Sequence, residues 1–186
     1  MLRVAIILGS TGPGRKGEAV TRWVYEIASS RGDAEFELVD IKYYDLPLLD
    51  EPMSAIFGQY SNDHTKAWSA KIESFDAFVF VTPEYNHATS GALKNAIDYL
   101  YNEWNKRAAG FVGYGGAGGT GAVENLRLVM GELMVADVRA QVALSLYTDF
   151  ENFSMFKPAP HHEKAVRDVL DQVIAWGGKL RSLREQ

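Results

Sequence analysis

Short apolar runs alternate with amphipathic stretches along the whole chain. Five of the apolar runs are expected to form β-strands, namely Arg3–Leu8, Glu35–Ile41, Ala77–Thr82, Gly110–Tyr114 and Gln141–Leu144. Three of them, the first, third and fourth, have continuously apolar centres. That pattern is typical of parallel strands that are covered on both faces of a sheet.

The stretches between these runs have the spacing of helices. Helices are expected over Glu18–Ser30, Asn62–Phe75, Gly91–Trp104, Ala122–Val135 and His161–Leu183. In the first of them, Ala19, Trp23 and Ile27 fall near one face, and Gly32 follows as a stop signal. Strands that alternate with helices predict an α/β fold with a doubly wound parallel sheet. Five strands favour a flavodoxin-like three-layer sandwich of strand order 2-1-3-4-5 over a six-stranded dinucleotide-binding fold.

The length of the chain suits one domain. Its 186 residues, 47% of them apolar, are expected to form a single flavodoxin-like unit over residues 1–186. The non-helical excursion Asp45–Gly58 is interpreted as a surface loop near a site, and not as a domain boundary.

Charge and cysteine content exclude several classes of function. The formal charge of −5 and the absence of any basic tract longer than two residues argue against a nucleic-acid partner. The apolar run Val4–Leu8 is too short for a signal peptide or a membrane span. With no cysteine, disulfides, thiolate metal sites and a CxxC redox pair are excluded. A cytoplasmic protein without a membrane partner is expected.

The segment that follows the first expected strand has the composition of a phosphate-binding loop. In the order 2-1-3-4-5, ligands bind outside the carboxyl ends of the first and third strands. Gly9–Glu18 contains four glycines that let backbone N–H groups turn inward, and the next helix aims its positive end at the same place. Ser10 and Thr11 add hydroxyl groups, and Arg15 and Lys16 add positive charge. The combination suits a terminal phosphate dianion.

Other interpretations of this loop fit less well. A P-loop needs Gly-Lys-Ser/Thr, which the chain lacks. A GxGxxG string is present at Gly12–Gly17, with Asp40 ending the second strand, but its first glycine lies several residues beyond the first strand. A mononucleotide phosphate loop therefore fits better than a dinucleotide fingerprint. An ordinary glycine-rich turn would explain the glycines, but not the hydroxyls and the paired cations.

Two further loops are expected at the same edge of the sheet. Pro83–His87, after the third strand, carries a proline, an aromatic ring and polar side chains that would form a wall for a flat ring. The alternative is a simple turn before a helix capped by Ser90. Gly115–Gly121, after the fourth strand, would let the backbone approach a ligand closely, or would be a flexible surface loop.

Together these segments resemble the NADPH-dependent FMN reductase family, which also contains quinone, azo-dye and chromate reductases. The resemblance covers nearly the whole chain. It is carried by Leu8–Thr11 with Pro13–Arg15, by Thr82–His87, by Gly91–Leu100, and by the glycine loop that leads to Arg127. The Pro-Glu-Tyr-Asn segment followed by Leu-Lys-Asn-Ala-Ile-Asp is the most specific part.

The resemblance implies a flavodoxin-like FMN enzyme with NADPH or NADH as co-substrate. Hydride would pass through FMN to a small acceptor (a quinone, an azo compound, a metal oxyanion or a flavin) in a ping-pong sequence, without a catalytic side chain or a metal. Members of this kind resemble homodimers or homotetramers. In them the helix that carries Tyr101 and Trp104 packs between subunits, although such an aromatic stripe is more often part of a core.

The resemblance also implies the cofactor-binding residues. Around the FMN phosphate it places Ser10, Thr11 and Arg15, with Gly17 and Glu18 acting through their backbone; along the isoalloxazine it places Pro83, Glu84, Tyr85 and Asn86, with Gly115 and Gly116 at the pyrimidine edge. Relatives often carry arginine where this chain has Gly12 and Gly121. Losing two cations would weaken binding of the phosphate or of the NADPH 2′-phosphate.

Two other classes of function remain open at this point. A flavodoxin-like electron carrier would bind FMN without substrate turnover of its own, and it would usually be far more acidic. A binding protein that kept the fold and lost the cofactor would have no affinity for flavin. His87 is either a substrate contact or a plain loop residue, and the neighbours His161 and His162 lack the i, i+4 spacing of a metal pair.

Overall fold

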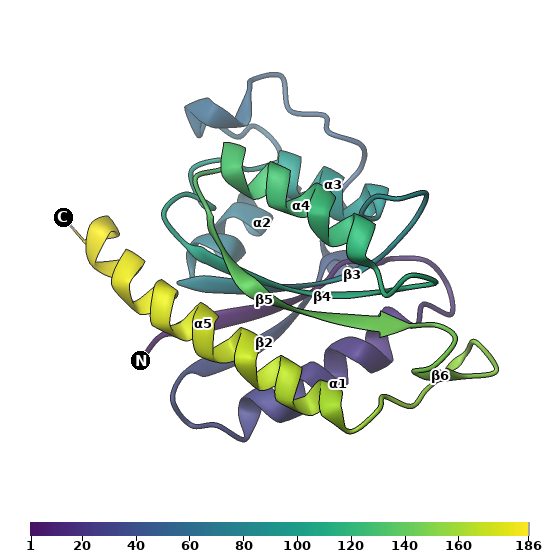
Figure 1. Cartoon of the computed structure of the whole chain (residues 1–186). Helices are drawn as coiled ribbons and strands as arrows, with labels where there is room; N and C mark the ends of the chain where they lie inside the picture. The colour runs from purple at the N-terminus through teal and green to yellow at the C-terminus, as the bar shows by residue number, and fades with distance from the viewer. Residues whose placement is uncertain (186) are drawn as a thin grey trace.

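A computed structural model describes residues 1–185 of the chain. Its elements in chain order are β1 (Arg3–Leu8), α1 (Gly17–Ser29), β2 (Glu35–Asp40), η1 (Ile41–Tyr44), η2 (Ala55–Phe57), α2 (Asp63–Glu73), β3 (Ala77–Pro83), α3 (Gly91–Asp98), β4 (Ala108–Gly115), α4 (Thr120–Glu132), β5 (Ala136–Ser145), β6 (Phe150–Glu151), β7 (Met155–Phe156) and α5 (His161–Arg184). The five long strands are parallel in the order β2-β1-β3-β4-β5, with helices on both faces (Figure 1). The predicted flavodoxin-like order is confirmed.

Each face of the sheet has its own core, which explains the continuously apolar strands. In β1, Ala5 and Ile7 pack into the cluster under α2, α3 and α4, whereas Val4 and Ile6 pack into the cluster under α1 and α5. All four side chains are fully buried. Because successive residues of a strand point to opposite faces, a strand between two helical layers needs apolar residues at every position.

The helix predicted over Gly91–Trp104 ends at Asp98, six residues early. Beyond it, Trp104 is fully buried, with its ring 4.9 Å from that of Phe78. Its indole N–H donates to the carbonyl oxygen of Ile97 at 3.1 Å. The apolar spacing thus reflects packing of a tight turn into the core, because i, i+3 and i, i+4 neighbours need not share one helix. Trp104 therefore lies outside the helix and belongs to the core, as an aromatic stripe more often does, whereas packing of α3 between subunits stays a prediction.

The last two long strands extend well past their predicted bounds. β4 begins at Ala108 instead of Gly110, and β5 runs over Ala136–Ser145 instead of Gln141–Leu144. Gly110 has no room for a side chain, since an added Cβ would lie 2.5 Å from Val169 Cγ1 on α5. Small residues at the start of β4 let α5 lie directly on the sheet, and such residues give a weak strand signal in the sequence.

The excursion Asp45–Gly58 is a surface segment, as predicted, although it includes the short turn η2. Asn95 of α3 holds it: its side-chain amide donates to the Pro47 carbonyl oxygen at 2.7 Å, and its side-chain oxygen accepts the Leu49 N–H at 2.9 Å. The Tyr99 hydroxyl donates to Asp50 at 2.8 Å. Burial, followed by this hydrogen bond, raises the pKa of Tyr99 to about 12.

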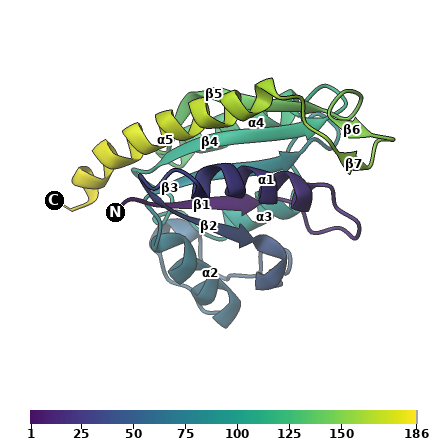
Figure 2. The same cartoon turned by 90° about the horizontal axis from the view of Figure 1, so that it is seen from below.

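The hairpin β6–β7 has no counterpart among the predicted elements. Each of its strands is two residues long, which is too short for any periodicity to appear in the sequence. The hairpin lies at the same end of the molecule as the loop after β1 (Figure 2). The carboxyl edge of the sheet therefore carries one more loop than the sequence indicates.

Candidate functional site

The carboxyl ends of β1, β3 and β4 border a cavity of about 220 Å³. It is lined by Gly12, Pro13, Gly14, Arg15, Lys16, Pro83, Glu84, Tyr85, Tyr114, Gly115 and Leu146. The cavity lies where the strand order reverses, which is the expected ligand position in such a sheet. It brings together Arg15, Pro83, Glu84, Tyr85 and Gly115 from the predicted set. It does not include the other predicted residues, and Thr11 lines a neighbouring hollow with Lys42 and Asn95.

The loop after β1 presents a run of unpaired backbone donors. Within the described part of the chain, no N–H group from Ser10 to Ala19 makes a backbone–backbone hydrogen bond of ordinary geometry, and Pro13 has no N–H at all. The run is bounded by the Gly9 N–H, which donates to the Val81 carbonyl oxygen at 2.9 Å, and by the Val20 N–H, which donates to that of Lys16 at 3.4 Å. The first turn of any helix leaves such donors open, and the helix dipole adds positive potential there. These donors fit a phosphate group, as FMN carries.

Gly17 holds the loop against β4. An ideal Cβ at this position would lie 2.5 Å from the Tyr114 hydroxyl and 2.7 Å from Ser10 Oγ. The Tyr114 hydroxyl in turn donates to Ser10 Oγ at 3.3 Å. Burial raises the pKa of Tyr114 to about 12, so the hydroxyl keeps its proton at neutral pH. Gly17 is thus required for a close approach between α1 and the sheet.

Tyr114 was missed by sequence reasoning, because it lies in an otherwise apolar strand. The signal that could have found it is the polar hydroxyl at the end of the strand, directly before the glycine loop.

Arg15 does not extend freely toward the cavity. Its guanidinium makes a two-pronged ion pair with Asp40 at the end of β2, with 2.7 Å between Nη1 and Oδ1. The two side chains are 10% and 6% exposed. The hydrogen bond to Asp40 raises the pKa of Arg15. Asp40, which the dinucleotide interpretation would assign to a ribose, is therefore engaged within the protein.

Lys16 is the neighbouring cation, and it lines the cavity. Among residues 1–185 it forms no ion pair with an acidic side chain. The sequence showed its charge but not that Arg15 would be engaged elsewhere. Glu18 pairs with Arg22 on the surface at 3.2 Å, so only its backbone N–H belongs to the run of open donors. Phosphate binding by Arg15, Gly17 and Glu18 stays a prediction.

Glu84 connects the end of β3 to the start of α4. One carboxylate oxygen accepts the Gly121 N–H at 3.0 Å, and the Glu84 N–H donates to the Tyr114 carbonyl oxygen at 3.0 Å. A carboxylate at a helix N-terminus is stabilised by the helix dipole. An ideal Cβ at Gly121 would lie 2.8 Å from His87 Nδ1. Glycine in place of the family's arginine fits this tight junction.

The segment after Glu84 is a two-residue turn. The Tyr85 and Ala88 N–H groups each donate to the carbonyl oxygen of the other residue, at 2.9 and 3.2 Å. Asn86 and His87 both have left-handed φ values, 51° and 67°, as in a type I′ turn. Tyr85 lines the cavity and is 55% exposed, whereas Asn86 is not among the lining residues. The predicted Ser90 cap is confirmed: Ser90 Oγ accepts the Leu93 N–H at 3.0 Å.

The glycine loop after β4 is a packed turn and not a flexible segment. The Gly115 carbonyl oxygen accepts the Gly118 N–H at 3.1 Å and the Leu146 N–H at 2.9 Å. Gly119 has φ of 71°, and a Cβ there would lie 2.4 Å from the Tyr114 nitrogen. Gly116 is exposed at the rim. Leu146, a second lining residue that sequence reasoning missed, reaches the cavity because this bond ties β5 to the loop.

Two further observations concern metals and membranes. Within residues 1–185, no group of three or more His, Asp and Glu side chains is placed to hold a metal ion. No helix of the described chain combines the length and the apolar character that a membrane span requires.

The sequence and structure were compared with known proteins. The family model of the NADPH-dependent FMN reductases matches residues 2–149. The chain belongs to this family. An NAD(P)H-dependent FMN reductase of Schizosaccharomyces pombe is 38% identical over 185 residues, which are 98% of this chain and 86% of the relative. A quinone reductase of Pseudomonas putida is 34% identical over 131 residues, 67% of each chain.

A solved structure agrees with the fold. The flavoenzyme NAD(P)H:(acceptor) oxidoreductase of Paracoccus denitrificans superimposes with a TM-score of 0.76 at 22% identity, covering 96% of this chain and 98% of that one. Membership of the family makes this chain an NAD(P)H-dependent flavin oxidoreductase with FMN as cofactor. Family membership favours the enzyme over the electron carrier and over a protein that has lost its flavin.

Proposed function

We propose that FMN binds in the cavity at the carboxyl edge of the sheet and serves the reduction of a small acceptor, quinones included, by NADPH or NADH. The run of open N–H donors from Ser10 to Ala19 supports this proposal most strongly, because these groups make no backbone hydrogen bond and can donate to a phosphate. Lys16 adds a positive charge at the same place. Ser10, Thr11, Arg15, Gly17 and Glu18 remain the proposed phosphate residues.

Bound FMN would supply the redox chemistry, accepting hydride from the nicotinamide and passing it to the acceptor. The chain has to hold the ring and leave one of its faces open. Tyr85 and Pro83 would lie along the ring, and Gly115 and Gly116 along its edge, with Glu84 and Asn86 completing the proposed set. The protonated Tyr114 hydroxyl would fix Ser10 beneath the phosphate. No side-chain acid or nucleophile is needed.

The proposal also covers the electron acceptor, the oligomeric state and the cellular location of the protein. The similarity to a quinone reductase supports a quinone as acceptor. A homodimer or homotetramer is proposed, because the surface segment Asp45–Gly58 exposes several apolar side chains. They are Leu48, Leu49, Met53, Ile56 and Phe57. A cytoplasmic location is supported by the absence of cysteine.

The deciding experiment is a flavin titration of the purified protein, followed by anaerobic addition of NADPH and NADH. FMN is expected to bind on the order of 100-fold more tightly than riboflavin, which lacks the phosphate. Either donor should then bleach the bound flavin directly, and the two rates rank the donors. Equal affinity for FMN and riboflavin would contradict the phosphate loop. Bound FMN that neither donor reduces would point to an electron carrier instead.

Steady-state kinetics and sedimentation test the remaining parts. Double-reciprocal plots with NADPH and a quinone are expected to give parallel lines, as ping-pong turnover requires; intersecting lines would show that both substrates bind together. Equilibrium sedimentation is expected to give two or four times the chain mass of 20.6 kDa, and a monomer would contradict the proposed assembly.

A further inference from the structure

An exposed aromatic pair lies beside the cavity, with Tyr147 in the turn between β5 and β6 and Phe153 at the tip of the hairpin β6–β7. Tyr147 and Phe153 are 72% and 56% exposed, and their rings meet edge to face with 5.4 Å between centroids. An ideal Cβ on Gly116 would lie 3.7 Å from Tyr147 Cε2, and Leu146 lines the cavity itself. The pair therefore continues the cavity wall outward from the glycine loop.

The conformation of Phe153 is unusual for a large side chain. Asn152 and Phe153 have φ of 50° and 56°, and the Ser154 N–H donates to the Glu151 carbonyl oxygen at 3.1 Å, which together describe a type I′ turn. Glycine is strongly preferred at the second of these positions, because a Cβ is strained there. A bulky residue such as Phe153 in the left-handed region of φ suggests that its side chain has a function that offsets the backbone strain.

The hairpin is firmly anchored, so the pair has a fixed position. Phe150 and Phe156 pair across the two strands and turn inward, where the Phe156 ring lies 5.4 Å from that of Trp23. Asp149, 2% exposed, accepts the Ser145 N–H at 2.9 Å and the Ala159 N–H at 3.1 Å. Two inward aromatics thus hold the base while Phe153 points to solvent at the tip.

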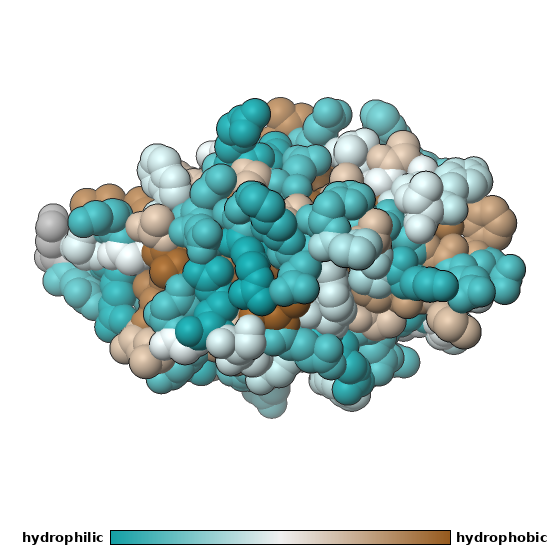
Figure 3. All heavy atoms as spheres, turned by 60° about the horizontal axis from the view of Figure 1, so that its bottom comes forward, coloured by the Kyte–Doolittle hydropathy of each residue, from teal (hydrophilic) through white to brown (hydrophobic). Residues whose placement is uncertain are grey.

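The surface around the pair is mixed in character. The end of the molecule that carries the hairpin shows apolar side chains beside hydrophilic ones (Figure 3). Exposed aromatic faces next to a ligand cavity attract flat, apolar rings, because stacking and apolar burial act together. A small inorganic ion has no such face and gains nothing from the pair.

We propose that Tyr147 and Phe153 form a platform that selects planar aromatic acceptors, such as quinones, at the mouth of the flavin cavity. The inference rests on the proposed function, since it needs FMN in the cavity. It concerns acceptor choice and not hydride transfer, so both residues act by binding the acceptor ring. Phe153 lies outside the range 2–149 that the family model matches, whereas Tyr147 lies inside it.

The test compares a planar acceptor, menadione, with ferricyanide, which has no aromatic face. For Phe153→Gly and Tyr147→Ala we expect the ratio of kcat/KM for menadione to that for ferricyanide to fall about tenfold. Phe153→Gly should also raise the Tm, because it relieves the turn, so its loss of selectivity cannot be a folding defect. Tyr147→Phe, which keeps the ring, should retain the native ratio.

A control and a binding measurement complete the design. Met155→Ala removes a side chain of similar exposure, 65%, from the same hairpin but outside the pair, and should leave activity with both acceptors unchanged. Without a donor, titration of the oxidised holoenzyme with menadione should give an about tenfold weaker Kd in Phe153→Gly.

Several outcomes would overturn the proposal. A selectivity ratio within twofold of native in both Phe153→Gly and Tyr147→Ala would do so. If the native protein is an oligomer and either variant dissociates, the aromatic pair belongs to the interface between subunits and not to an acceptor site. A native protein that neither binds FMN nor oxidises a donor would overturn the proposed function as well, whereas an active enzyme with an unresponsive ratio overturns the acceptor platform alone.

Discussion

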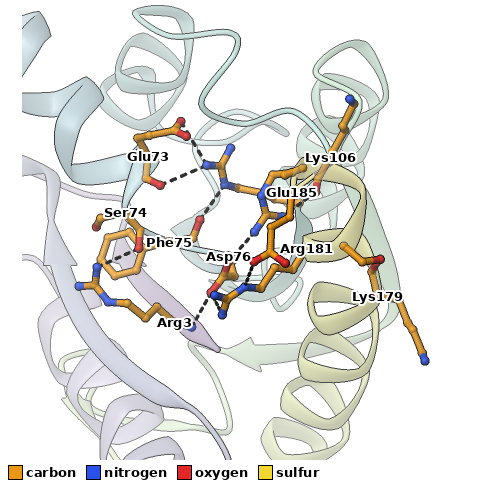
Figure 4. A network of polar contacts seen from close by, with 12 residues as sticks. Arg3, Glu73, Ser74, Phe75, Asp76, Lys106, Lys179, Arg181 and Glu185 are labelled. Atoms are coloured by element: carbon orange, nitrogen blue, oxygen red, sulfur yellow. Dashed lines mark hydrogen bonds and ion pairs between the residues drawn. The ribbon is translucent and has the colours of Figure 1, made fainter. Parts of the chain in front are cut away.

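The two ends of the sheet differ in whether their polar groups are hydrogen-bonded within the protein. At the amino end, Asp76 accepts the Arg3 N–H at 2.9 Å and pairs with Arg184 and Arg181 of α5 (Figure 4). At the carboxyl end, the donors from Ser10 to Ala19 make no backbone–backbone hydrogen bond within the described chain. The two apolar cores on the faces of the sheet lie between these ends. Polar groups that are satisfied internally stabilise a fold, and those left open are available to a ligand.

The amino end also joins distant parts of the chain. Arg107 is 2% exposed and donates to the carbonyl oxygens of Phe75 and Glu73, at 2.7 and 3.2 Å. Arg184 donates to the carbonyl oxygen of Lys106 at 2.9 Å. Burial lowers the pKa of Arg107 despite its pairing with Glu73. This end is built for stability, so changes there should affect unfolding and not flavin binding.

Arg107→Met should give the largest loss of stability. It leaves buried carbonyl oxygens without donors, and we expect the free energy of unfolding to fall by about 4 kcal/mol. Urea unfolding of the apo protein measures this change. FMN affinity of the folded variant should stay within twofold of native, and a larger loss would show that the two ends are coupled.

Asp149→Asn should cost about 2 kcal/mol, because one acceptor oxygen of a buried, multiply bonded carboxylate is lost. Burial raises the Asp149 pKa, but the N–H donors of Ala159 and Ser145 outweigh it and lower the pKa below its ordinary value. The contribution is therefore complete above the unfolded pKa of about 4 and is lost as pH falls through the lowered value. Unfolding followed from pH 6 to 3 should show a flatter decline in the variant.

Gly17→Ala should weaken FMN binding at least about tenfold and lower stability by about 2 kcal/mol, since its Cβ meets the Tyr114 hydroxyl and Ser10 Oγ. Flavin titration and thermal unfolding measure the two effects. The matched control is Gly178→Ala on α5, where a Cβ meets nothing within 4 Å. That control should raise stability by about 0.5–1 kcal/mol and leave FMN binding unchanged.

Lys16→Gln should weaken FMN binding about fivefold and reduce its salt dependence, with little change in stability. Arg15→Gln should behave differently: it leaves Asp40 without its cation, so it should lower stability as well as weaken FMN binding. FMN titrations at two salt concentrations, together with urea unfolding, separate the variants. If Arg15→Gln weakens FMN more than Lys16→Gln does, Arg15 releases Asp40 to bind the phosphate.

Gly12→Arg should have the smallest effect, an about threefold tighter binding of FMN. Gly12 is exposed, and a Cβ there meets nothing within 4 Å, so the family's arginine can be accommodated. Gly121→Arg offers the contrast, because its Cβ would collide with His87 and displace the Glu84 cap. Isothermal titration should show tighter binding only for Gly12→Arg; unchanged affinity would place this position away from the phosphate.

Most of the fold was predictable from local patterns. The continuously apolar strands and the glycine-rich segments predicted the strand order and the edge that holds the cavity, because buried parallel strands and backbone turns leave strong sequence signals. The end of α3 was not predictable, since Trp104 keeps helical spacing while it packs in a turn. The hairpin β6–β7 is too short to have a period.

By itself the sequence determined the family, the flavodoxin-like order, and the loops that meet at one edge. Only the tertiary structure decided what each polar side chain does there. It showed that Arg15 is paired with Asp40, that Lys16 faces the cavity, and that Tyr114 and Leu146 complete its wall. The physical reason is distance along the chain: glycine turns and apolar strands are local properties, whereas these contacts depend on how β2, β4 and β5 come together.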